Sequence, residues 1–405
     1  MDSTGTCSDA HLAALKKAVA EEIDALAPRL IGISDDIHAH PEIRFEERYA
    51  AKLLADTLEG GGLAVERGTA GMETAFKGET GTGQGGPAVA ILGEYDALPV
   101  LGHACGHNIM GTAAVGAGLA LAKVMSGDAA RAAGLNGRLL VLGTPAEEGG
   151  GGKVIMLREG VLEGVDAALI VHPGNANRAH AESIASFKMD IRFHGRPAHA
   201  AASPHQGINA LDALVLTYSA ISALRQQLKP DVRIHGIITK GGDAPNIIPE
   251  LTEGSFIIRS ADKAYNQEVI AKVKDCARGA ALQTGATVEF VETGIPYDPM
   301  KSNTVLEDLH RHNMGALGLS EPAEPRRGAG STDMGNISQA LPAIHPSIAI
   351  GPATLVGHTR EMCDASRSEE GHRAVINAAK CMAMTALDLF LRPELVEKAW
   401  AEFRG

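Results

Sequence analysis

The chain has 405 residues, more than a single hydrophobic core usually supports, so its length favours two domains or one large α/β unit. Hydrophobic residues make up 45% of the sequence and charged residues 21%, and no uninterrupted apolar run approaches the roughly 18 residues of a membrane span. The formal net charge of -12 argues against a nucleic-acid-binding protein, because such proteins usually present a basic face. We therefore expect a globular protein without nucleic-acid or membrane partners.

Charged residues are spread through the first thirty positions, where Lys16, Lys17 and Glu21 interrupt any apolar segment. This pattern lacks the apolar core of a secretory signal, so we expect a cytoplasmic protein. The five cysteines form an odd number without close pairs, which argues against a disulfide framework. Cys105 lies between two histidines, and the others are interpreted as spectators: Cys7, Cys276, Cys363 and Cys381.

Helices and apolar strands alternate in the first part of the chain. Apolar spacing predicts helices over 8–65, broken near Pro41, and a further helix over 109–124. Three continuous apolar runs are each typical of a strand buried on both faces: 87–99, 138–148 and 165–173. Strands that alternate with helices imply an α/β fold with a mainly parallel sheet flanked by helices.

The order of elements changes after Glu182. Strand, helix, strand, strand, helix and strand are predicted over 186–195, 207–227, 232–242, 251–261, 267–285 and 287–293. This βαββαβ order is that of a ferredoxin-like α+β unit. We therefore predict two domains, one made of 1–182 and 294–405 and the other, inserted into it, made of 183–293.

Residues that can bind metal or transfer protons follow the predicted strands of the first domain. They form four clusters: Glu94 and Asp96 in GEYDALP, His103, Cys105 and His107 in GHACGHN, Glu147 and Glu148 in TPAEEGG, and His172 in VHPG. Open α/β sheets bind ligands at the carboxyl ends of their strands, and thiolate, imidazole and carboxylate together suit zinc or a similar divalent ion. A single His or Cys is more often a packing residue. The shared position of the four clusters favours a metal site.

The adjacent pair Glu147 and Glu148 has two interpretations. Two neighbouring carboxylates repel each other unless cations or protons neutralise them, so the pair is either a solvated turn or part of a metal site. In a metal site, one carboxylate binds metal and the other takes a proton from water and passes it to a leaving amine. The residues alone do not assign the two roles.

Seven runs of the sequence, taken together and in order, resemble the aminoacylase and carboxypeptidase G superfamily of two-metal peptidases: GEYDALP, GHACGHN, PAEEGGGGK, HP, GRPAHAA, GGDAPNIIP and GHTREM. Within it the chain looks most like the p-aminobenzoyl-glutamate hydrolase-like branch of amidohydrolases, over nearly its whole length. The resemblance implies a zinc-peptidase type catalytic domain with an inserted lid and dimerisation domain, and a homodimer. It also implies two divalent metal ions, with zinc preferred over manganese or cobalt.

The resemblance assigns roles to residues of the first domain. It makes Cys105 the ligand shared by both metals and completes the two shells with His107, Glu148, His172 and His358. Glu147 becomes the general base and acid, and Asp96 orients a metal-binding imidazole. Glu94 stands where other branches have a ligating residue, so its ligation stays open.

Residues of the inserted domain match positions that bind substrate in the family. These are His199, His235, Asn246 and Arg259, and the loop with Ser331 and Asp333 resembles a further substrate-binding segment. The planar guanidinium of Arg259 can form two hydrogen bonds with a carboxylate. His199 and Arg259 can as well be interpreted as ordinary polar residues of strands.

The implied reaction is hydrolysis of the amide bond of N-acyl amino acids or small dipeptides that keep a free carboxylate, such as p-aminobenzoyl-glutamate-like or β-alanyl dipeptide-like substrates. Aromatic residues are only 3% of the chain, so no aromatic acyl pocket is evident. Two alternatives remain: a non-catalytic metal-binding or regulatory protein with the same fold, and an aminopeptidase, for which no acidic subsite for a substrate amine is evident.

Overall fold

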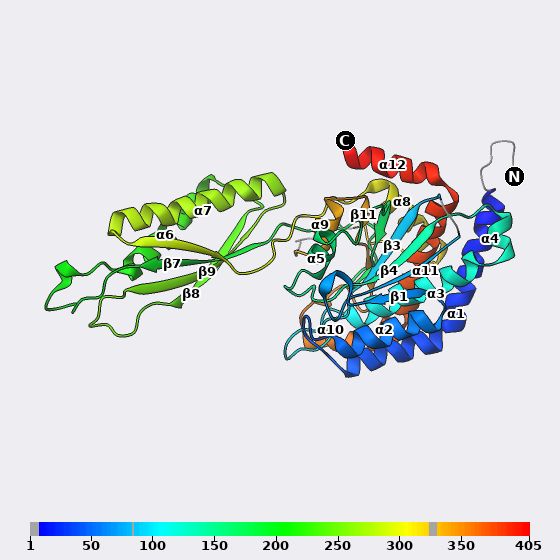
Figure 1. Cartoon of the computed structure of the whole chain (residues 1–405), viewed down its shortest axis with the longest axis horizontal. Helices are drawn as coiled ribbons and strands as arrows, with labels where there is room; N and C mark the ends of the chain where they lie inside the picture. Colours follow the sequence, from blue (N-terminus) through cyan, green and yellow to red (C-terminus); the bar gives the residue numbers. More distant parts are fainter. Residues whose placement is uncertain (1–7, 83–84, 324–329) are drawn as a thin grey trace. The chain divides into compact units, whose positions relative to one another are not determined.

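The structure is a computed structural model that describes residues 8–82, 85–323 and 330–405. Cys7 lies outside these residues. Within them the chain forms two compact units (Figure 1), and the first contains the described residues up to Glu182 together with 300–323 and 336–405.

The second unit contains 183–299 and 330–335, and so extends past the predicted 183–293. Backbone hydrogen bonds account for the additional residues. Ser186 and Tyr297 donate to each other's carbonyl oxygens, and the N–H of Ile184 donates to the carbonyl of Gly330.

A six-stranded sheet forms the centre of the first unit. Its order is β1-β2-β4-β3-β5-β11, with β1 at Ala64–Arg67, β2 at Phe76–Gly81, β3 at Ala88–Gly93, β4 at Arg138–Gly143, β5 at Ala167–Leu169 and β11 at Ala343–Ile344. β4, β3, β5 and β11 pair in parallel, whereas β2 pairs antiparallel with both β4 and the edge strand β1. The prediction of a mainly parallel sheet flanked by helices is confirmed. The helical prediction for 8–65 is wrong at its end, because the chain leaves its helix at Gly60 and enters β1.

The described residues outside 183–299 form further helices, and several of these contact one another. They are α1 (Asp9–Ala39), α2 (Arg48–Gly60), α3 (His107–Met125), α4 (Asp128–Ala132), α5 (Gly152–Arg158), α8 (Thr304–Ala316), α9 (Met334–Ser338), α10 (Arg360–Ala365), α11 (Glu369–Leu391) and α12 (Pro393–Arg404). α1, α3 and α11 contact each other, and α3 lies against β3 and β4.

α3 and α11 are long and apolar enough to cross a membrane when only length and composition are considered. In the structure, 83% of the most apolar window of each helix is buried. α3 is buried nearly all round because it is rich in Ala and Gly and packs between the sheet and its neighbouring helices. Both helices are therefore explained as core helices of the first unit.

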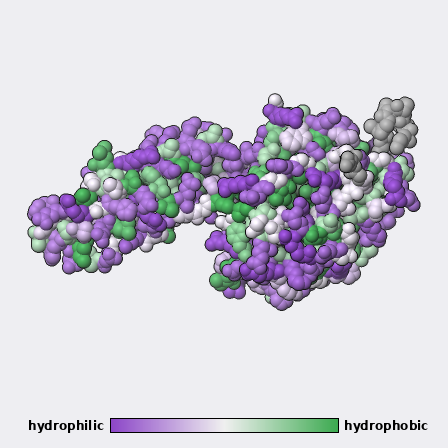
Figure 2. Space-filling view, viewed as in Figure 1, coloured by the Kyte–Doolittle hydropathy of each residue, from purple (hydrophilic) through white to green (hydrophobic). Residues whose placement is uncertain are grey.

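Polar residues predominate on the face seen in Figure 2.

The second unit has the predicted βαββαβ order. Its elements are β7 (Phe187–His194), α6 (Ala210–Leu224), β8 (Arg233–Lys240), β9 (Leu251–Arg259), α7 (Lys263–Thr284) and β10 (Thr287–Glu292). The strands form an antiparallel sheet in the order β10-β7-β9-β8, and α6 and α7 pack against it and against each other. This confirms the ferredoxin-like α+β prediction.

The parallel strands of the first unit bring their carboxyl ends to one edge of the sheet. Glu94 follows β3 and Thr144 follows β4, while a short parallel pair, β6 (His172–Gly174) and β12 (Ser347–Ala349), continues beyond β5 and β11. α3 starts at His107 with its N-cap residue Gly106 in the left-handed region at φ 79°. Segments far apart in sequence therefore meet at this edge.

Replacing Gly118 by Ala tests the close packing of α3. A Cβ at Gly118 would lie 2.5 Å from Cγ2 of Val141, a stiff side chain buried in β4. We expect the variant to lose roughly 1–3 kcal/mol of unfolding free energy, measured by denaturant unfolding. The matched control is Gly279→Ala in α7, where a Cβ meets nothing within 4 Å and Ala favours the helix by about 1 kcal/mol. Equal stability of the two variants would contradict the packing described here.

Candidate metal centre and active site

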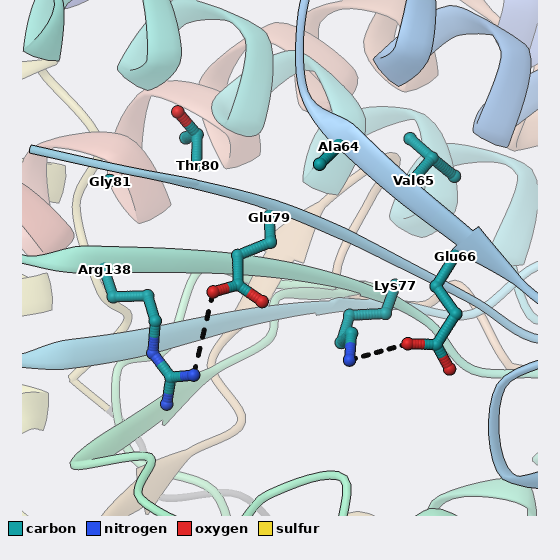
Figure 3. Close-up of a pocket in the computed structure, with 8 residues that line it drawn as sticks. All are labelled: Ala64, Val65, Glu66, Lys77, Glu79, Thr80, Gly81 and Arg138. Carbon is teal, nitrogen blue, oxygen red and sulfur yellow. Dashed lines mark ion pairs between the residues drawn. The ribbon is translucent and has the colours of Figure 1, made fainter.

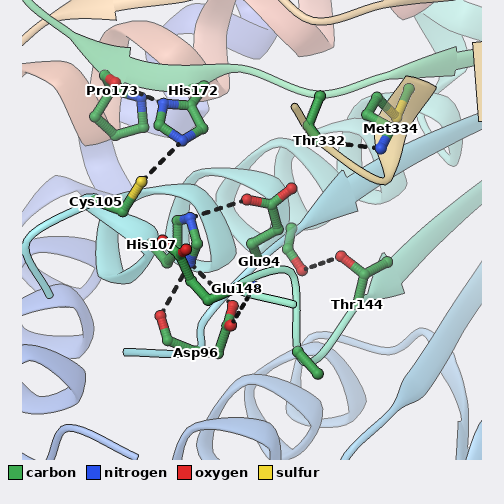
Figure 4. Close-up of polar contacts among 12 residues, drawn as sticks. Glu94, Asp96, Cys105, His107, Thr144, Glu148, His172, Pro173, Thr332 and Met334 are labelled. Atoms are coloured by element: carbon green, nitrogen blue, oxygen red, sulfur yellow. Dashed lines mark hydrogen bonds and ion pairs between the residues drawn. The ribbon is translucent and has the colours of Figure 1, made fainter. Parts of the chain in front are cut away.

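The structure brings all five predicted metal ligands together in the first unit, and Figure 4 shows four of them, Cys105, His107, Glu148 and His172. Two groups have ligand atoms that all lie within 4.8 Å of one another: Cys105, His107 and His172, and Cys105, Glu148 and His358. Cys105 belongs to both. A third group contains Glu94, His107 and Glu147.

Asp96 connects two of these residues. Its Oδ1 lies 3.0 Å from Nδ1 of His107, and its Oδ2 accepts a hydrogen bond of 2.9 Å from the backbone N–H of Glu148. Nδ1 of His107 also lies 2.9 Å from the carbonyl oxygen of Asp96. Because both neighbours of Nδ1 are acceptors, Nδ1 carries the hydrogen and Nε2 is left to bind a metal. This geometry agrees with the orienting role predicted for Asp96.

The thiol of Cys105 lies between two imidazoles. Its Sγ is 3.4 Å from Nε2 of His172 and 3.7 Å from Nε2 of His358. Nδ1 of His172 lies 2.6 Å from the carbonyl oxygen of Pro173, which leaves Nε2 of His172 facing the sulfur. Nε2 of His358 lies 3.4 Å from Oε1 of Glu148.

The electrostatics of the cluster favour the thiolate. Burial acts to raise the pKa of Cys105, but the positive charges of His172 and His107 outweigh it and hold this pKa well below its usual value. Contacts with Cys105 and Glu148 raise the pKa of His358 to about 10. The thiolate form is the one that binds metal.

Glu94 is held by a buried lysine. Its Oε1 lies 2.6 Å from Nζ of Lys153 and its Oε2 lies 3.1 Å from Nε2 of His107, and all three side chains are fully buried. Burial acts to raise the pKa of Glu94, but the charges of Lys153 and His107 lower it. Glu94 is therefore a charged residue whose carboxylate already has a cationic partner.

The donor set fits a divalent metal pair. The two ligand groups share the sulfur of Cys105. One adds the imidazoles of His107 and His172, and the other adds the carboxylate of Glu148 and the imidazole of His358. Nε2 of His107 and Oε1 of Glu148 are buried but make no hydrogen bond of good geometry within the described residues. Such buried atoms need a partner, and a metal ion supplies one.

His199, His235, Asn246 and Arg259, which were predicted to bind substrate, lie in the second unit, where His235 contacts Arg259 and His199 lies near Asn246 along two bridged segments. Nε of Arg259 lies 3.4 Å from Nε2 of His235, and its Nη1 donates a 2.7 Å hydrogen bond to Oγ of Ser331. His199 pairs with Ile247 in an isolated β-bridge beside Asn246. Nδ1 of His199 accepts hydrogen bonds from the backbone of the two residues at 201–202, so its ring is fixed locally.

Arg259 has properties that suit an anion site. Burial lowers its pKa, and it forms no ion pair with an acidic side chain among the described residues. A half-buried guanidinium whose contacts are a hydroxyl and an imidazole can still accept a carboxylate.

Two residues near the cluster were not predicted from the sequence. The sequence pattern places Lys153 only at the end of a Gly-rich turn, and Glu47 only in a break between helices. Glu47 is fully buried, and its Oε1 accepts a 2.8 Å hydrogen bond from the backbone N–H of Ala146. A run of acids in HPEIRFEE is the available signal, but it does not show which acid is buried.

A separate cavity of about 550 Å³ lies on β1, β2 and β4 (Figure 3). Its charged residues pair with each other, Lys77 with Glu66 at 2.7 Å and Arg138 with Glu79 at 3.7 Å. None of the predicted site residues lines it. We therefore assign the chemistry to the metal-ligand groups and not to this cavity.

Comparison with known proteins gives the same family as the sequence motifs. A model of the peptidase dimerisation domain of the M20 family matches residues 181–284. The chain is 39% identical to the Xaa-Arg dipeptidase of Mus musculus, over 99% of this chain and 94% of that protein. It is 32% identical to one of the subunits of the p-aminobenzoyl-glutamate hydrolase of Escherichia coli K12, over 94% of this chain and 93% of that protein.

Solved structures show the same fold. The aminobenzoyl-glutamate utilization protein of Klebsiella pneumoniae matches with a TM-score of 0.70 and 22% identity, over 91% of this chain and 97% of that one. The YXEP protein of Bacillus subtilis, described as a dinuclear metal-binding peptidase, matches with a TM-score of 0.68 and 21% identity, over 90% of this chain and 99% of that one. The resemblance predicted from the motifs is confirmed, and the chain belongs to the M20 family of metal-dependent peptidases and amidohydrolases.

Proposed function

We propose that this protein is a two-metal amidohydrolase that cleaves the amide bond of N-acyl amino acids or small dipeptides with a free carboxylate. The observation that carries the proposal is the pair of ligand groups that share Cys105, with Glu147 beside them. The relatives named as a dipeptidase and as a p-aminobenzoyl-glutamate hydrolase support β-alanyl dipeptide-like and p-aminobenzoyl-glutamate-like substrates.

The metal ligands in this proposal are Cys105, His107, Glu148, His172 and His358. Zinc is the preferred metal because thiolate and imidazole are its common ligands, and manganese or cobalt are alternatives. Two such ions supply Lewis acidity to water and to the amide carbonyl. Asp96 acts by fixing the ring of His107 and the backbone of Glu148.

Glu147 is the proposed general base and acid. It lies with Glu94 and His107 in the third group, whereas Glu148 lies with the sulfur of Cys105. This separation gives the two neighbouring carboxylates different tasks. Glu147 takes a proton from the attacking water as the oxygen bonds to the carbonyl carbon, and it gives the proton to the nitrogen as the C–N bond breaks.

Residues of the second unit are proposed to hold the substrate. Arg259 supplies a guanidinium for the carboxylate, and His199, His235 and Asn246 supply further polar contacts. The match to a dimerisation domain supports a homodimer formed through this unit. The described cysteines are free, and Cys105 is needed as a thiolate, which supports the proposed cytoplasmic location.

Hydrolysis of a substrate panel tests the proposal. We expect the metal-loaded protein to cleave at least one of p-aminobenzoyl-glutamate, N-acyl amino acids and β-alanyl dipeptides, and a chelator to abolish the cleavage. The matched control for each substrate is its C-terminal amide, which lacks the carboxylate proposed to contact Arg259 and should react more slowly. Tight metal binding without turnover of any substrate would support the non-catalytic alternative.

Replacing Glu147 by Gln tests the assignment of the base. The amide keeps the size of the side chain but cannot accept the proton of water, so kcat should fall by about 10²–10⁴ with the metal content unchanged. The control is Glu148→Gln, which removes a proposed ligand and should lower the metal content, measured by elemental analysis. Full activity of the Glu147 variant would contradict its role.

Replacing Lys153 by Met tests whether Glu94 is a charged, lysine-paired residue and not a metal ligand. The variant leaves a buried carboxylate without the lysine charge, and we expect a loss of about 3–5 kcal/mol of unfolding free energy in the metal-free protein. The double variant Lys153→Met with Glu94→Gln should recover most of this loss and still bind both metals. Lys52→Met, at an exposed ion pair with Asp56, is the control that should change little.

A further inference from the structure

A strained backbone residue lies directly before the proposed base Glu147 and the proposed metal ligand Glu148. Ala146 has φ 59°, in the left-handed region that side chains other than glycine rarely adopt, and it is fully buried. Glu147 and Glu148 are the next two residues. The direction in which the chain leaves Ala146 therefore sets where both carboxylates point.

Backbone hydrogen bonds surround Ala146 on both sides. Its carbonyl oxygen accepts hydrogen bonds of 2.9 Å from the N–H groups of Gly150 and Gly151. Its N–H donates the 2.8 Å hydrogen bond to Oε1 of Glu47. The glycine contacts come from the same turn, whereas Glu47 comes from a segment ninety-nine residues away. Glu47 is thus the long-range contact that fixes this turn.

The space around the turn leaves little freedom for rearrangement. A Cβ at Gly150 would lie 2.5 Å from Cβ of Ala146 and 2.7 Å from Cε2 of Phe45, which is two residues before Glu47. A Cβ at Gly152 would lie 2.0 Å from the carbonyl oxygen of Pro145. The segment containing Glu47 therefore packs directly on the turn that carries Glu147 and Glu148.

Burying the carboxylate of Glu47 is energetically unfavourable, which suggests that this side chain has a structural or functional role. It is fully buried at the start of α2, and burial raises its pKa to about 7 despite the hydrogen bonds that it accepts from backbone N–H groups. The charge of Asp96 contributes to the same rise in pKa. Its neighbour Glu46 is exposed to solvent, so the chain does not bury every acid of this segment.

We propose that Glu47 is a positioning residue, whose carboxylate holds Ala146 in the left-handed conformation and thereby aims Glu147 and Glu148 into the metal centre. The inference rests on the proposed function of these two acids. It distinguishes between the two ligand groups that share Cys105, because of these two only the group with Glu148 and His358 contains a residue of this turn. The group of Cys105, His107 and His172 should not depend on Glu47.

Titration of the metal-free protein with Co²⁺, followed by its absorbance, tests the inference without an activity assay. The wild type should take up two equivalents. Glu47→Ala should weaken the Co²⁺-binding step that involves Glu148 by about tenfold or more and should leave the other step unchanged. The expected size of the effect is the cost of keeping a non-glycine residue in the left-handed region without the Glu47 contact. Glu47→Gln, which keeps an oxygen acceptor, and the exposed control Glu46→Ala should both titrate within about threefold of the wild type.

A second substitution separates a positioning role from a general loss of stability. Glycine adopts the left-handed region without strain, so Ala146→Gly in the Glu47→Ala background should restore the weakened Co²⁺ step to within about threefold of the wild type. With a cleaved substrate, kcat of Glu47→Ala should fall by about 10²-fold with little change in KM, and the double variant should recover most of this loss.

The possible results have distinct meanings. If the wild type takes up no Co²⁺, the proposed function is wrong and the inference is wrong with it. If the wild type takes up two equivalents and Glu47→Ala titrates in the same way, only the inference is wrong. Should Glu47→Ala alone fail to fold, the double variant decides: a folded double variant with both steps intact supports the inference, and one that still lacks the Glu148-containing step overturns it.

Discussion

The metal centre depends on the carboxylate of Asp96, which contacts two ligands that come from different parts of the chain. One oxygen faces the ring of His107 at the start of α3, and the other accepts the backbone N–H of Glu148 after β4. Asp96 itself follows β3, so a single side chain fixes a helix start and a neighbouring loop to the end of a central strand. The ligand groups keep their spacing because these three elements belong to one packed core.

The centre concentrates acids in a buried place, and this is costly unless cations are present. Lys153 provides one fixed positive charge against Glu94, and the imidazoles lower the pKa of Cys105. The other acids that follow β3 and β4 are Asp96, Glu147 and Glu148. Bound divalent ions would add positive charge beside these acids, so metal binding and folding would be coupled.

The sequence predicted the fold, and the structure brings the proposed ligands close together, for definable reasons. Buried parallel strands are continuous apolar runs, and their ends carry Cys, His and Glu residues at positions that a sheet brings together. The short antiparallel strands β1 and β2 escape prediction because they are weakly apolar and follow helices and turns. Glu47 and Lys153 could not be recognised, because each is defined by one contact with a residue distant in sequence, Ala146 or Glu94. The left-handed backbone conformation of Ala146 and His358 could not be predicted either, because neither alanine nor histidine favours that conformation.

The first unit is discontinuous along the chain, and this has a consequence for the order of folding during synthesis. The segment from Ser183 to Pro299 contains the complete sheet and both helices of the second unit, whereas the first unit needs β11, His358 and α11 from later in the chain. At about 5–20 residues per second, the ribosome takes roughly 5–20 s to make the residues after Pro299. We expect the second unit to fold within that interval, while α1 and α3 wait for α11 to cover them. During this interval the nascent chain exposes an incomplete core that already contains every proposed metal ligand except His358. With this order of elements, we therefore expect that Cys105 and its neighbours can bind metal before the first unit has folded.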